Sequence, residues 1–429
     1  MPDRINVGII GFGVVGGGTY ETLTRNAERI AARVGAEVRV ARVADVDWAR
    51  EREITCPPEL RTTDAAAMVV DPEIHIVVET IGGIDPAREL ISQAIQAGKS
   101  VVTSNKELIA KHGHELLALA EEKGVDVQFE GSVGGVIPVI RSLKESLEAD
   151  RITEVMGIVN GTTNYILTRM TTEGLDFAQA LTAAQELGYA EADPTNDVEG
   201  IDAKYKIAIL AAIAFGLHVP LEEIYTEGIT RVTAQDIAYA KKMGYAIKLL
   251  AIARQGEGNC IEARVHPVML RKTHPLANVN GPFNAIFVRG DGCDEVMLYG
   301  RGAGARPTGV AVAGDVLDCA RNLHKGLPGR VLCTCHDQAR VLPMADITTK
   351  SYVRMRVKDR PGVLGSIATI FGTEGVSIAS VHQEDTDGEL AEIVWVTHRT
   401  PEASLRSALG AIGNLAIVDG IPGMLRVED

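Results

Sequence analysis

Short apolar runs alternate with longer amphipathic stretches through the first third of the chain. Runs of strand length occupy 7–10, 38–43, 76–79, 100–102 and 125–129. Stretches with apolar residues at helical spacing lie between and after them, at 19–29, 86–97 and 107–123. Because strands that alternate with helices build a parallel sheet with helices on its faces, this pattern predicts a doubly wound α/β domain.

A second pattern, with a different order, occupies the C-terminal part of the chain. Predicted strands lie at 352–357, 377–382, 389–397 and 416–421, and predicted helices lie at 365–374 and 402–413. The order β-α-β-β-α-β is typical of a split β-α-β domain. Residues 326–349, which carry Gly, Pro and mixed polarity, are predicted to form a linker before this domain.

The amino-acid composition and net charge disfavour several classes of binding partner and cellular environment. The net charge is −14 and no basic run occurs, which disfavours nucleic acid and anionic membranes as partners. We expect no membrane helix and no signal peptide. Six cysteines in so long a chain form no secreted disulfide framework, so a reduced, cytoplasmic environment is expected. For Cys333, Cys335 and His336 we favour reduced thiols over a zinc site, because no second ligand cluster accompanies them.

The first predicted strand ends in a glycine-rich turn. It has the pattern G-x-G-x-x-G and consists of Gly11, Phe12, Gly13, Val14, Val15 and Gly16. Between a strand and a helix, such glycines allow a tight turn, close approach of a pyrophosphate and close helix–strand packing. The helix N-terminus adds free N–H groups for the phosphates. The sequence therefore predicts a Rossmann-type dinucleotide-binding domain; the alternative is a tight turn without a ligand.

Polar residues at the ends of the following strands are candidates for the same ligand. Asp45 ends the second predicted strand, where an acid holds a ribose 2′-hydroxyl, and it favours NAD. Arg42 and Arg50 are near enough in sequence to receive a 2′-phosphate, so NADP stays open. Thr80 and Lys106 follow later strand ends and are expected to face the dinucleotide. For Lys106, an exposed helix start is the alternative.

A second glycine-rich bend runs through residues 130–138. It exposes carbonyl oxygens beside the carboxylate of Glu130, and oxygen ligands suit a hard monovalent cation. A plain interdomain turn is the alternative.

The middle of the chain places charged residues on an otherwise apolar helix. Asp202 and Lys206 are four positions apart and therefore share a helix face. The face continues through Ile209, Leu210 and Ile213, so the lysine should point inward, where a charge is costly unless it has a function. An ordinary Asp–Lys helix pair is the alternative.

A polar motif, Asn160-Gly-Thr-Thr-Asn164, follows the predicted strand at 152–159. Thr162 and Thr163 would cap the helix that begins there. Capping does not explain all four polar side chains, so we also expect them to line a polar pocket.

Residues 184–206 resemble the motif of the homoserine dehydrogenases. They match Ala-x3-Gly-Tyr-Ala-x2-Asp-Pro-x2-Asp-Val-x-Gly-x-Asp-x3-Lys at every fixed position. The glycine-rich turn, the motifs at 104–106 and 160–164, and residues 302–308 resemble the same family in the same order. The resemblance implies reversible oxidation of L-homoserine to L-aspartate 4-semialdehyde with NAD or NADP, in threonine, methionine and isoleucine biosynthesis.

The resemblance also implies catalytic roles. Lys206 is expected to exchange a proton with the substrate oxygen, Asp202 to orient the substrate hydroxyl, and Lys106 to lie between cofactor and substrate. A lysine poised near neutral pH suits this chemistry, since the hydroxyl loses its proton as hydride leaves.

Further residues are implied as ligand contacts. The amino end of the substrate is expected at Gly188, Glu191 and Asp197. Glu130, Val133, Gly135 and Ile137 fall on the family's sodium-binding loop. Gly304 is expected to touch the cofactor.

The expected domains follow from these patterns and the resemblance. A Rossmann domain takes 1–135 and is completed by 305–325, and an α+β catalytic and dimerisation domain takes 136–304. The last 80 positions, 350–429, resemble an ACT domain, a module that binds amino acids at a subunit interface. A homodimer or homotetramer is therefore expected.

The ACT resemblance implies regulation. Asp359, Gly362 and Gln383 are the expected effector contacts, and the family relation implies L-threonine as effector. A dimerisation module without a ligand is the alternative. On this basis, deletion of 350–429 should abolish inhibition by threonine and leave turnover intact.

Two alternative functions are a non-catalytic regulator and a different type of dehydrogenase. A non-catalytic regulator that senses nucleotide and amino acid would not need the Asp202/Lys206 pair. A semialdehyde dehydrogenase that forms an acyl thioester needs a nucleophilic cysteine, and none lies between Cys56 and Cys260.

Overall fold

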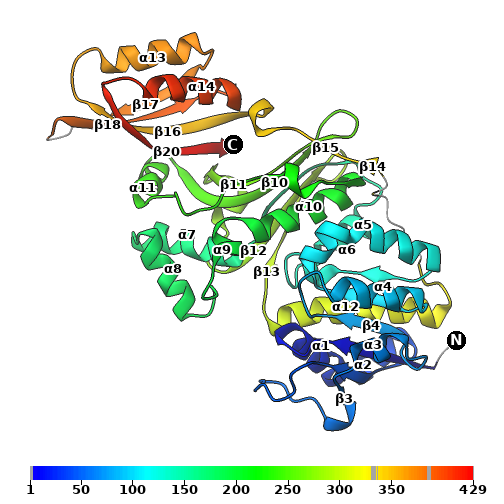
Figure 1. Ribbon diagram of the computed structural model, residues 1–429. Coiled ribbons are helices and arrows are strands. Elements are labelled where there is room, and N and C mark those ends of the chain that lie inside the picture. The colour runs from blue at the N-terminus through cyan, green and yellow to red at the C-terminus, as the bar shows by residue number, and fades with distance from the viewer. Residues whose placement is uncertain (1–2, 330–334, 336, 384–387, 429) are drawn as a thin grey trace. The chain divides into compact units, whose positions relative to one another are not determined.

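The structure is a computed structural model that describes residues 3–329, 335, 337–383 and 388–428 (Figure 1). The chain forms two compact units. The first consists of Met1–Val155, Tyr205–Leu221 and Phe283–Ala339, and the second of Met156–Lys204, Glu222–Pro282 and Arg340–Asp429. Two elements continue from one unit into the other, β7 (Ile152–Ile158) and α10 (Ile201–Phe215).

A six-stranded parallel sheet forms the centre of the first unit. Its strands are β1 (Arg4–Ile10), β2 (Glu37–Ala44), β3 (Arg61–Thr62), β4 (Ile76–Glu79), β5 (Ser100–Thr103) and β6 (Val127–Gln128). The order is β3-β2-β1-β4-β5-β6, and every adjacent pair is parallel. This is the strand order of a dinucleotide-binding doubly wound sheet, and the predicted fold of this region is confirmed.

Helices cover this sheet. They are α1 (Val14–Arg25), α2 (Ala27–Val34), α3 (Ala65–Val70), α4 (Ala87–Gln96), α5 (Lys106–Lys123) and α12 (Ala305–Lys325). The single helix predicted over 19–29 is wrong, because two helices meet at Asn26. The side-chain amide of Asn26 donates to the Thr22 carbonyl at 3.0 Å, which ends α1 as a competing local hydrogen bond.

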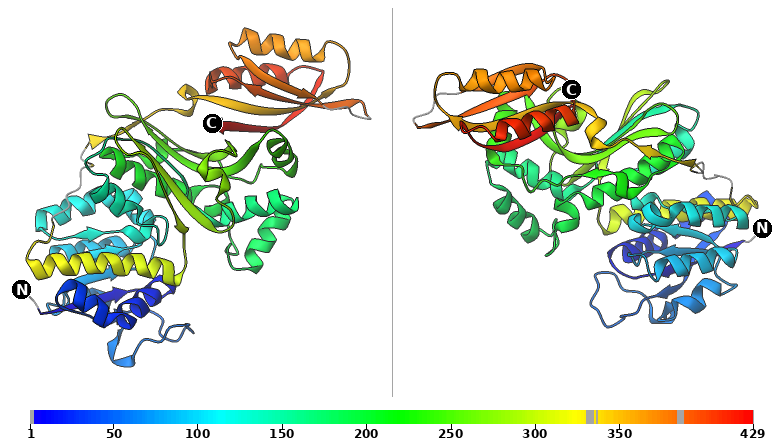
Figure 2. Two further views of the ribbon diagram at one scale, coloured as in Figure 1. Left: turned by 180° about the vertical axis from the view of Figure 1, so that it is seen from behind. Right: turned by 45° about the horizontal axis from the view of Figure 1, so that its top comes forward.

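Helix α12 returns from late in the sequence and packs against α1 (Figure 2). The two helices approach through small residues: a Cβ at Gly18 would lie 2.1 Å from the Ala305 carbonyl oxygen, and one at Gly309 would lie 2.5 Å from the carbonyl carbon of Gly18. Val312 and Val316 then enter the same buried core as Val7 and Ile9.

Shorter elements complete the first unit. They are α6 (Val139–Arg141), η3 (Ser142–Ser146), β8 (Leu217–His218), the antiparallel hairpin β12 (Phe283–Gly290) and β13 (Asp294–Arg301), and β14 (Asp337–Gln338). Strand β14 pairs with β8.

The second unit begins with helices and continues into a sheet. Its helices and short strands are α7 (Gly161–Glu173), α8 (Phe177–Glu186), α9 (Thr195–Val198), β9 (Tyr225–Thr226), α11 (Ala234–Lys242), β15 (Arg340–Val341), η6 (Met344–Asp346), α13 (Val363–Thr373) and α14 (Glu402–Gly413). The longer strands are β10 (Tyr245–Gln255), β11 (Cys260–Arg271), β16 (Thr348–Lys358), β17 (Ile378–Gln383), β18 (Leu390–Thr397) and β20 (Val418–Glu428). They lie in the order β10-β11-β20-β16-β18-β17.

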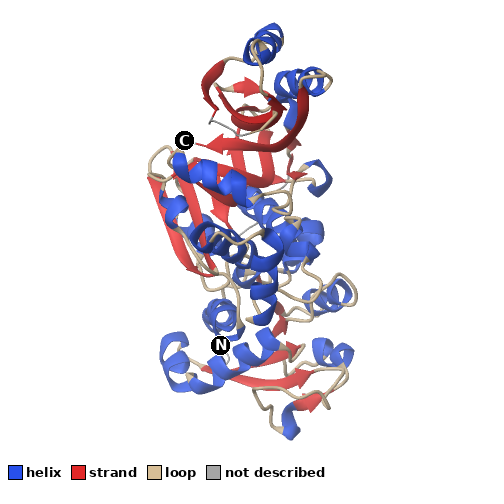
Figure 3. Cartoon of the chain, turned by 90° about the vertical axis from the view of Figure 1, so that its left-hand side faces the viewer, coloured by secondary structure: helices blue, strands red, loops and turns tan. Residues whose placement is uncertain are grey.

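The predicted β-α-β-β-α-β order of the C-terminal region is confirmed. Its four strands are arranged β20-β16-β18-β17, and helices α13 and α14 cover one face of this part of the sheet (Figure 3). Trp395, Phe371 and Ile367 are buried between helices and strands.

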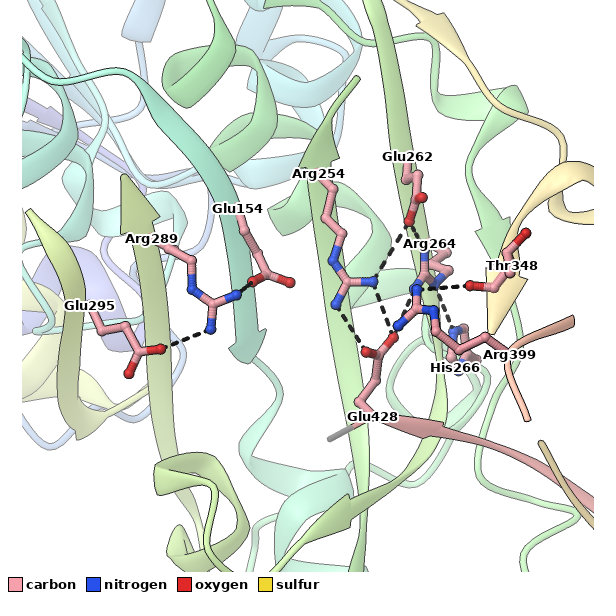
Figure 4. A network of polar contacts seen from close by, with 10 residues as sticks. All are labelled: Glu154, Arg254, Glu262, Arg264, His266, Arg289, Glu295, Thr348, Arg399 and Glu428. Atoms are coloured by element: carbon pink, nitrogen blue, oxygen red, sulfur yellow. Dashed lines mark hydrogen bonds and ion pairs between the residues drawn. The ribbon is translucent and has the colours of Figure 1, made fainter. Parts of the chain in front are cut away.

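This C-terminal region shares a sheet with the strands that precede it. Strand β20 pairs in parallel with β11, with Arg426 opposite Val268 and Glu428 opposite Leu270. The Glu428 carboxylate accepts hydrogen bonds from Arg254 at 2.9 Å and from the fully buried Arg264 at 2.8 Å (Figure 4). Burial raises the pKa of Glu428, but the two guanidinium groups outweigh it and lower that pKa overall.

The described part of the predicted linker is also paired. Strand β14 joins β8, and β15 runs parallel to the start of β11. Cys335 is disulfide-bonded, so the expectation of reduced thiols is wrong for this residue, while Cys333 and His336 lie outside the described residues. Among the helices described, none has the length and apolar character needed to span a bilayer.

Candidate active site

The glycine-rich turn lies between β1 and α1, and its three glycines differ in their surroundings. Gly11 has φ +88°, and a Cβ there would lie 2.9 Å from the Thr80 carbonyl oxygen. A Cβ at Gly16 would lie 2.0 Å from the Gly11 carbonyl oxygen, whereas one at Gly13 would meet no atom within 4 Å. Gly11 and Gly16 therefore serve packing, and Gly13 borders open space at the start of α1. That space fits a pyrophosphate against the N-terminus of a helix that has no side-chain cap.

Asp45 is tied to the glycine-rich turn. Its carboxylate accepts a hydrogen bond from the Phe12 backbone N–H at 2.6 Å and forms an ion pair with Arg52 at 2.9 Å. The Nε of Arg52 donates to the Phe12 carbonyl at 2.8 Å. The two arginines considered from the sequence lie elsewhere: Arg42 donates to the Glu59 carbonyl, and Arg50 is exposed. Arg52 was missed because its pairing with Asp45 depends on the fold of the loop after β2.

Hydrogen bonds of Glu79 and Thr80 fix the loop after β4. The Thr80 hydroxyl donates to the Gly11 carbonyl at 2.8 Å, which links this predicted cofactor residue to the glycine-rich turn. The fully buried Glu79 accepts hydrogen bonds from the Ile81 N–H at 2.6 Å and the Thr103 hydroxyl at 2.6 Å. Glu79 was not singled out from the sequence, because it reads as the last residue of an apolar strand.

Lys106 is the first residue of α5, directly after β5. Asn105 caps this helix through its side-chain oxygen, which accepts from the Leu108 N–H at 3.1 Å, and its amide donates to the Gly83 carbonyl at 2.6 Å. Because carboxyl ends of parallel strands meet at one edge of a sheet, Gly11, Thr80 and Lys106 all lie at the same edge.

The bend at 130–137 is held by a buried carboxylate. Glu130 accepts hydrogen bonds from the backbone N–H groups of Ile140 and Arg141, both at 2.8 Å, so its side chain caps α6. Burial raises the pKa of Glu130. Its own N–H donates to Asp315 at 2.8 Å, and burial raises the pKa of Asp315 to about 8.

The backbone of this bend folds back on the segment before α12. Gly134 and Gly135 have φ of +73° and +60°, and a Cβ at Gly135 would lie 2.6 Å from the Arg301 carbonyl oxygen. Gly304, with φ +124°, is the N-cap of α12. Among the residues that the structure describes, no group of three or more His, Cys, Asp or Glu side chains is arranged to hold a metal ion. Any cation at Glu130, Val133, Gly135 and Ile137 would therefore depend on carbonyl oxygens.

In the second unit, one amide joins two predicted site residues. The side-chain nitrogen of Asn160 donates to Asp197 at 2.6 Å and to Asp202 at 2.9 Å. The Asn160 side-chain oxygen accepts from the Thr163 N–H at 2.8 Å, so Asn160 is the cap of α7. The prediction that Thr162 and Thr163 cap this helix is wrong, because their hydroxyls donate to the carbonyl of Tyr189 and to Asn160.

Asp202 and Lys206 lie one turn apart on α10. Their exposed fractions are 4% and 8%, and Ile209 and Leu210 further along the helix are buried, whereas Ile213, expected on the same face, is only partly buried. The inward orientation predicted from the sequence is confirmed. A buried lysine at this position is consistent with a role for its amine.

The loop between α8 and α9 carries Gly188 and Glu191. Gly188 has φ +72°, which lets the chain turn away from α8. The loop is fixed by the Thr162 hydroxyl on the Tyr189 carbonyl at 2.6 Å, and the rings of Tyr165 and Tyr189 lie 4.8 Å apart. Glu191 remains exposed on this fixed loop.

Asn164, the last residue of the polar motif, has a structural role. Its amide donates to the Gly281 carbonyl at 2.9 Å, and its oxygen accepts from the amine of Lys248 at 3.1 Å. Burial lowers the pKa of Lys248 to about 8. Lys248 was missed because it interrupts an otherwise apolar strand without a recognisable motif.

The three predicted effector residues lie at one end of the C-terminal sheet. Asp359 and Gly362 follow β16, where Gly362 has φ +88° and caps α13, and Gln383 ends β17. Strands β16 and β17 both run antiparallel to β18, so their carboxyl ends lie at the same edge. Asp359 and Gln383 are exposed there.

Comparisons with known proteins agree along the whole chain. Residues 11–130 match the family model "Homoserine dehydrogenase, NAD binding domain", residues 138–317 match "Homoserine dehydrogenase", and residues 351–416 match "ACT domain". A homoserine dehydrogenase of Synechocystis sp. is 47% identical over 431 residues, which cover 99% of each chain.

Solved structures of homoserine dehydrogenases are also similar to this chain. The crystal structure of a homoserine dehydrogenase from Thiobacillus denitrificans aligns with a TM-score of 0.94 at 46% identity, covering 99% of this chain and 98% of that chain. A hyperthermophilic archaeal homoserine dehydrogenase in complex with NADPH aligns with a TM-score of 0.61 at 29% identity, covering 74% of this chain and 97% of that chain.

Proposed function

Because the chain belongs to the homoserine dehydrogenase family, an oxidoreductase family with a nicotinamide cofactor, we propose that it interconverts L-homoserine and L-aspartate 4-semialdehyde through Lys206. The observation that most directly supports this proposal is that Asp202 and Lys206 are both buried on one face of α10. The side-chain amide of Asn160 donates hydrogen bonds to both Asp202 and Asp197. Family membership makes the chain an enzyme, so the non-catalytic sensor is set aside.

The proton transfer is assigned to Lys206. A dinucleotide held by the first unit would supply hydride transfer to or from the carbinol carbon of the substrate. The amine of Lys206 accepts the proton of the substrate hydroxyl during oxidation and gives it back during reduction. Asp202 orients that hydroxyl, and its carboxylate is itself fixed by the Asn160 amide.

The substrate's ammonium group is assigned to acidic residues. Asp197 and Glu191 offer charge-assisted hydrogen bonds to it, and Gly188 leaves the backbone accessible beside them. The hydrogen bond from Asn160 fixes Asp197, and the contacts of Tyr189 fix the loop that carries Glu191.

The cofactor is NAD or NADP, held along Gly11 to Gly16 with Thr80 and Lys106 at the same edge of the sheet and with Gly304 at the start of α12. Asp45 favours a free 2′-hydroxyl, whereas its partner Arg52 supplies positive charge for a 2′-phosphate. We therefore assign the cofactor preference to this pair.

A sodium ion is proposed at the bend of residues 130–137, with the backbone carbonyls of Glu130, Val133, Gly135 and Ile137 as its ligands. Oxygen donors suit a hard cation, and the left-handed glycines Gly134 and Gly135 turn the backbone sharply there. The ion would stabilise the bend; no catalytic step is assigned to it.

Regulation by L-threonine is proposed for the ACT domain, at Asp359, Gly362 and Gln383, in a homodimer or homotetramer. The common edge that these residues occupy supports a single effector site.

Steady-state kinetics test the proposed function. Homoserine-dependent formation of NADH or NADPH is expected, with one cofactor preferred and with inhibition by added threonine. Absence of turnover with both cofactors would contradict the proposed activity, and turnover that threonine does not change would contradict only the regulatory part.

A further inference from the structure

A polar cavity of about 560 Å³ lies in the second unit, away from the three ACT residues at the end of β16 and β17. Its walls come from β9 and the loop before α11, from α14, and from β20. Arg426, in this wall, pairs with Ser351 on β16, eight positions before Asp359. At about 3.3 Å per strand residue, Arg426 is roughly 25 Å from the level of Asp359 along the strand, whereas Gly423, which also lines the cavity, lies opposite Arg354 and is roughly 15 Å from it.

The floor of the cavity is a buried charge network. Arg426, 3% exposed, donates to Glu402 at 2.6 Å and to Glu227 at 2.7 Å, and its Nη2 lies 3.2 Å from the Tyr225 hydroxyl. All three arginine nitrogens are engaged, since Nε also donates to Glu402. The guanidinium of Arg426 is therefore committed to these partners, whereas Glu227, whose side chain is 25% exposed, remains part of the cavity lining.

The remaining lining carries both signs of charge. Arg231 is exposed and has no ion-pair partner among the described residues. Arg406 is half exposed; it forms an ion pair with Glu402 at 3.2 Å, and its guanidinium lies 6.0 Å from the centroid of the Tyr225 ring. Glu199 and Glu227 lie in the same lining. An isolated phosphate or nucleotide would meet these carboxylates, whereas a zwitterion satisfies both signs, with its carboxylate on guanidinium and its ammonium on carboxylate.

The cavity is connected to the proposed substrate carboxylates through residues 198–200. The Thr230 hydroxyl donates to Glu199 at 3.1 Å, and the Ile229 N–H donates to the Val198 carbonyl at 2.8 Å. A Cβ at Gly228 would lie only 2.2 Å from that same carbonyl oxygen. Residues 228–230 of the cavity wall therefore contact Val198 and Glu199, which lie between Asp197 and Asp202 in the sequence.

We propose that this cavity is a second effector site, one that binds a free α-amino acid and acts on Asp197 and Asp202 through Glu199. The carboxylate of the ligand binds Arg231 and Arg406, and its ammonium binds Glu199 and Glu227. Occupancy changes the contacts of Glu199 and thus the spacing of the two carboxylates that Asn160 joins. The effect on turnover rests on the proposed function, whereas binding does not.

Binding is tested on the full chain by calorimetry with each common L-amino acid, and with its primary amide as a probe that lacks the carboxylate. At least one amino acid is expected to bind the wild type, its amide is expected not to bind, and Arg231→Ala should weaken binding at least roughly tenfold. Arg29→Ala, another exposed arginine, is the matched control, and Gln383→Ala should leave this binding unchanged.

The outcomes separate the proposals. No binding by any amino acid, or binding that survives both Arg231→Ala and Arg406→Ala, overturns the second site. Binding lost in Gln383→Ala but kept in Arg231→Ala also overturns it. Basal turnover of Arg231→Ala should equal that of the wild type; a wild type without turnover contradicts the proposed function and leaves the binding result standing.

Discussion

The side-chain amide of Asn160 donates to the carboxylate of Asp202 at 2.9 Å. The same nitrogen reaches Asp197 at 2.6 Å, so one neutral group holds two acids that the substrate is proposed to contact. The hydrogen bonds fix both carboxylates while leaving their charge available to an ammonium and a hydroxyl.

Replacing Asn160 should therefore lower activity more than stability. Asn160→Ala is expected to reduce kcat/KM for homoserine by roughly ten- to hundredfold, because the two carboxylates lose their common donor. Asn164→Ala, on the same helix, is the matched control and should lower the melting temperature with less effect on turnover, since Asn164 contacts Lys248 and the 279–281 loop. Normal kinetics in Asn160→Ala would remove Asn160 from the site.

Substitutions of two glycines in the glycine-rich turn should have different effects, one on cofactor binding and the other on stability. Gly13→Ala should keep the stability of the wild type, because its Cβ meets nothing within 4 Å, and should lose NAD(P)H binding. Gly16→Ala should lower the free energy of unfolding by about 1–3 kcal/mol, since its Cβ would lie 2.0 Å from the Gly11 carbonyl oxygen. Fluorescence titration of NAD(P)H and chemical denaturation measure the two effects; tight cofactor binding by Gly13→Ala would contradict the assignment.

The stability of the protein should depend on pH through Asp315. Its pKa in the folded chain is raised to about 8 from 3.8, so the folded state binds more protons between these values. The stabilising contribution is complete below pH 4 and is lost as pH rises through about 8. The free energy of unfolding should fall by at most about 1.4 kcal/mol per pH unit in that window.

Asp315→Asn should flatten this dependence, because an amide oxygen can still accept from the Glu130 N–H without titrating. Denaturant unfolding at several pH values measures the slope, with Asp318→Asn as the neighbouring control. An unchanged slope in Asp315→Asn would assign the pH dependence to another group.

Removal of the C-terminal domain should not be as harmless as the sequence indicates. Deletion of 350–429 removes Glu428 from the fully buried Arg264 and leaves β11 without its partner β20. Arg264 keeps its ion pair with Glu262 but loses the one with Glu428, and β11 loses its pairing with β20. Because breaking a buried ion pair is strongly destabilising, the shortened chain should unfold at lower denaturant concentration.

A single substitution separates that cost from regulation. Glu428→Gln should also lower the free energy of unfolding, because the neutral amide pairs less strongly with Arg254 and Arg264. It should keep any inhibition by threonine, since Glu428 lies at the other end of β20 from the predicted effector residues. A truncated chain as stable as the wild type would show that the contacts of β20 contribute little.

Elements with strong local patterns were predictable. The apolar runs of β1, β4 and β5, with glycine at Gly11 and Gly16, were enough for the doubly wound sheet, and the α14 bounds of Glu402–Gly413 agree with the sequence. The buried face of α10 followed from the spacing of Asp202 and Lys206.

Features that depend on distant residues were not predictable. The pairing of β20 with β11 joins segments some 160 residues apart and has no local pattern. Asn160 lies 37 and 42 positions from the acids it joins, and Arg52 reaches Asp45 only through the fold of a loop. The break at Asn26 was missed because the apolar periodicity continues through it.

The most direct test of the account is the turnover of Lys206→Ala measured beside its affinity for NAD(P)H. Homoserine oxidation is expected to fall by at least roughly a hundredfold while cofactor affinity stays that of the wild type, because the amine transfers the proton and does not hold the dinucleotide. Near-normal turnover in Lys206→Ala would contradict this role of Lys206.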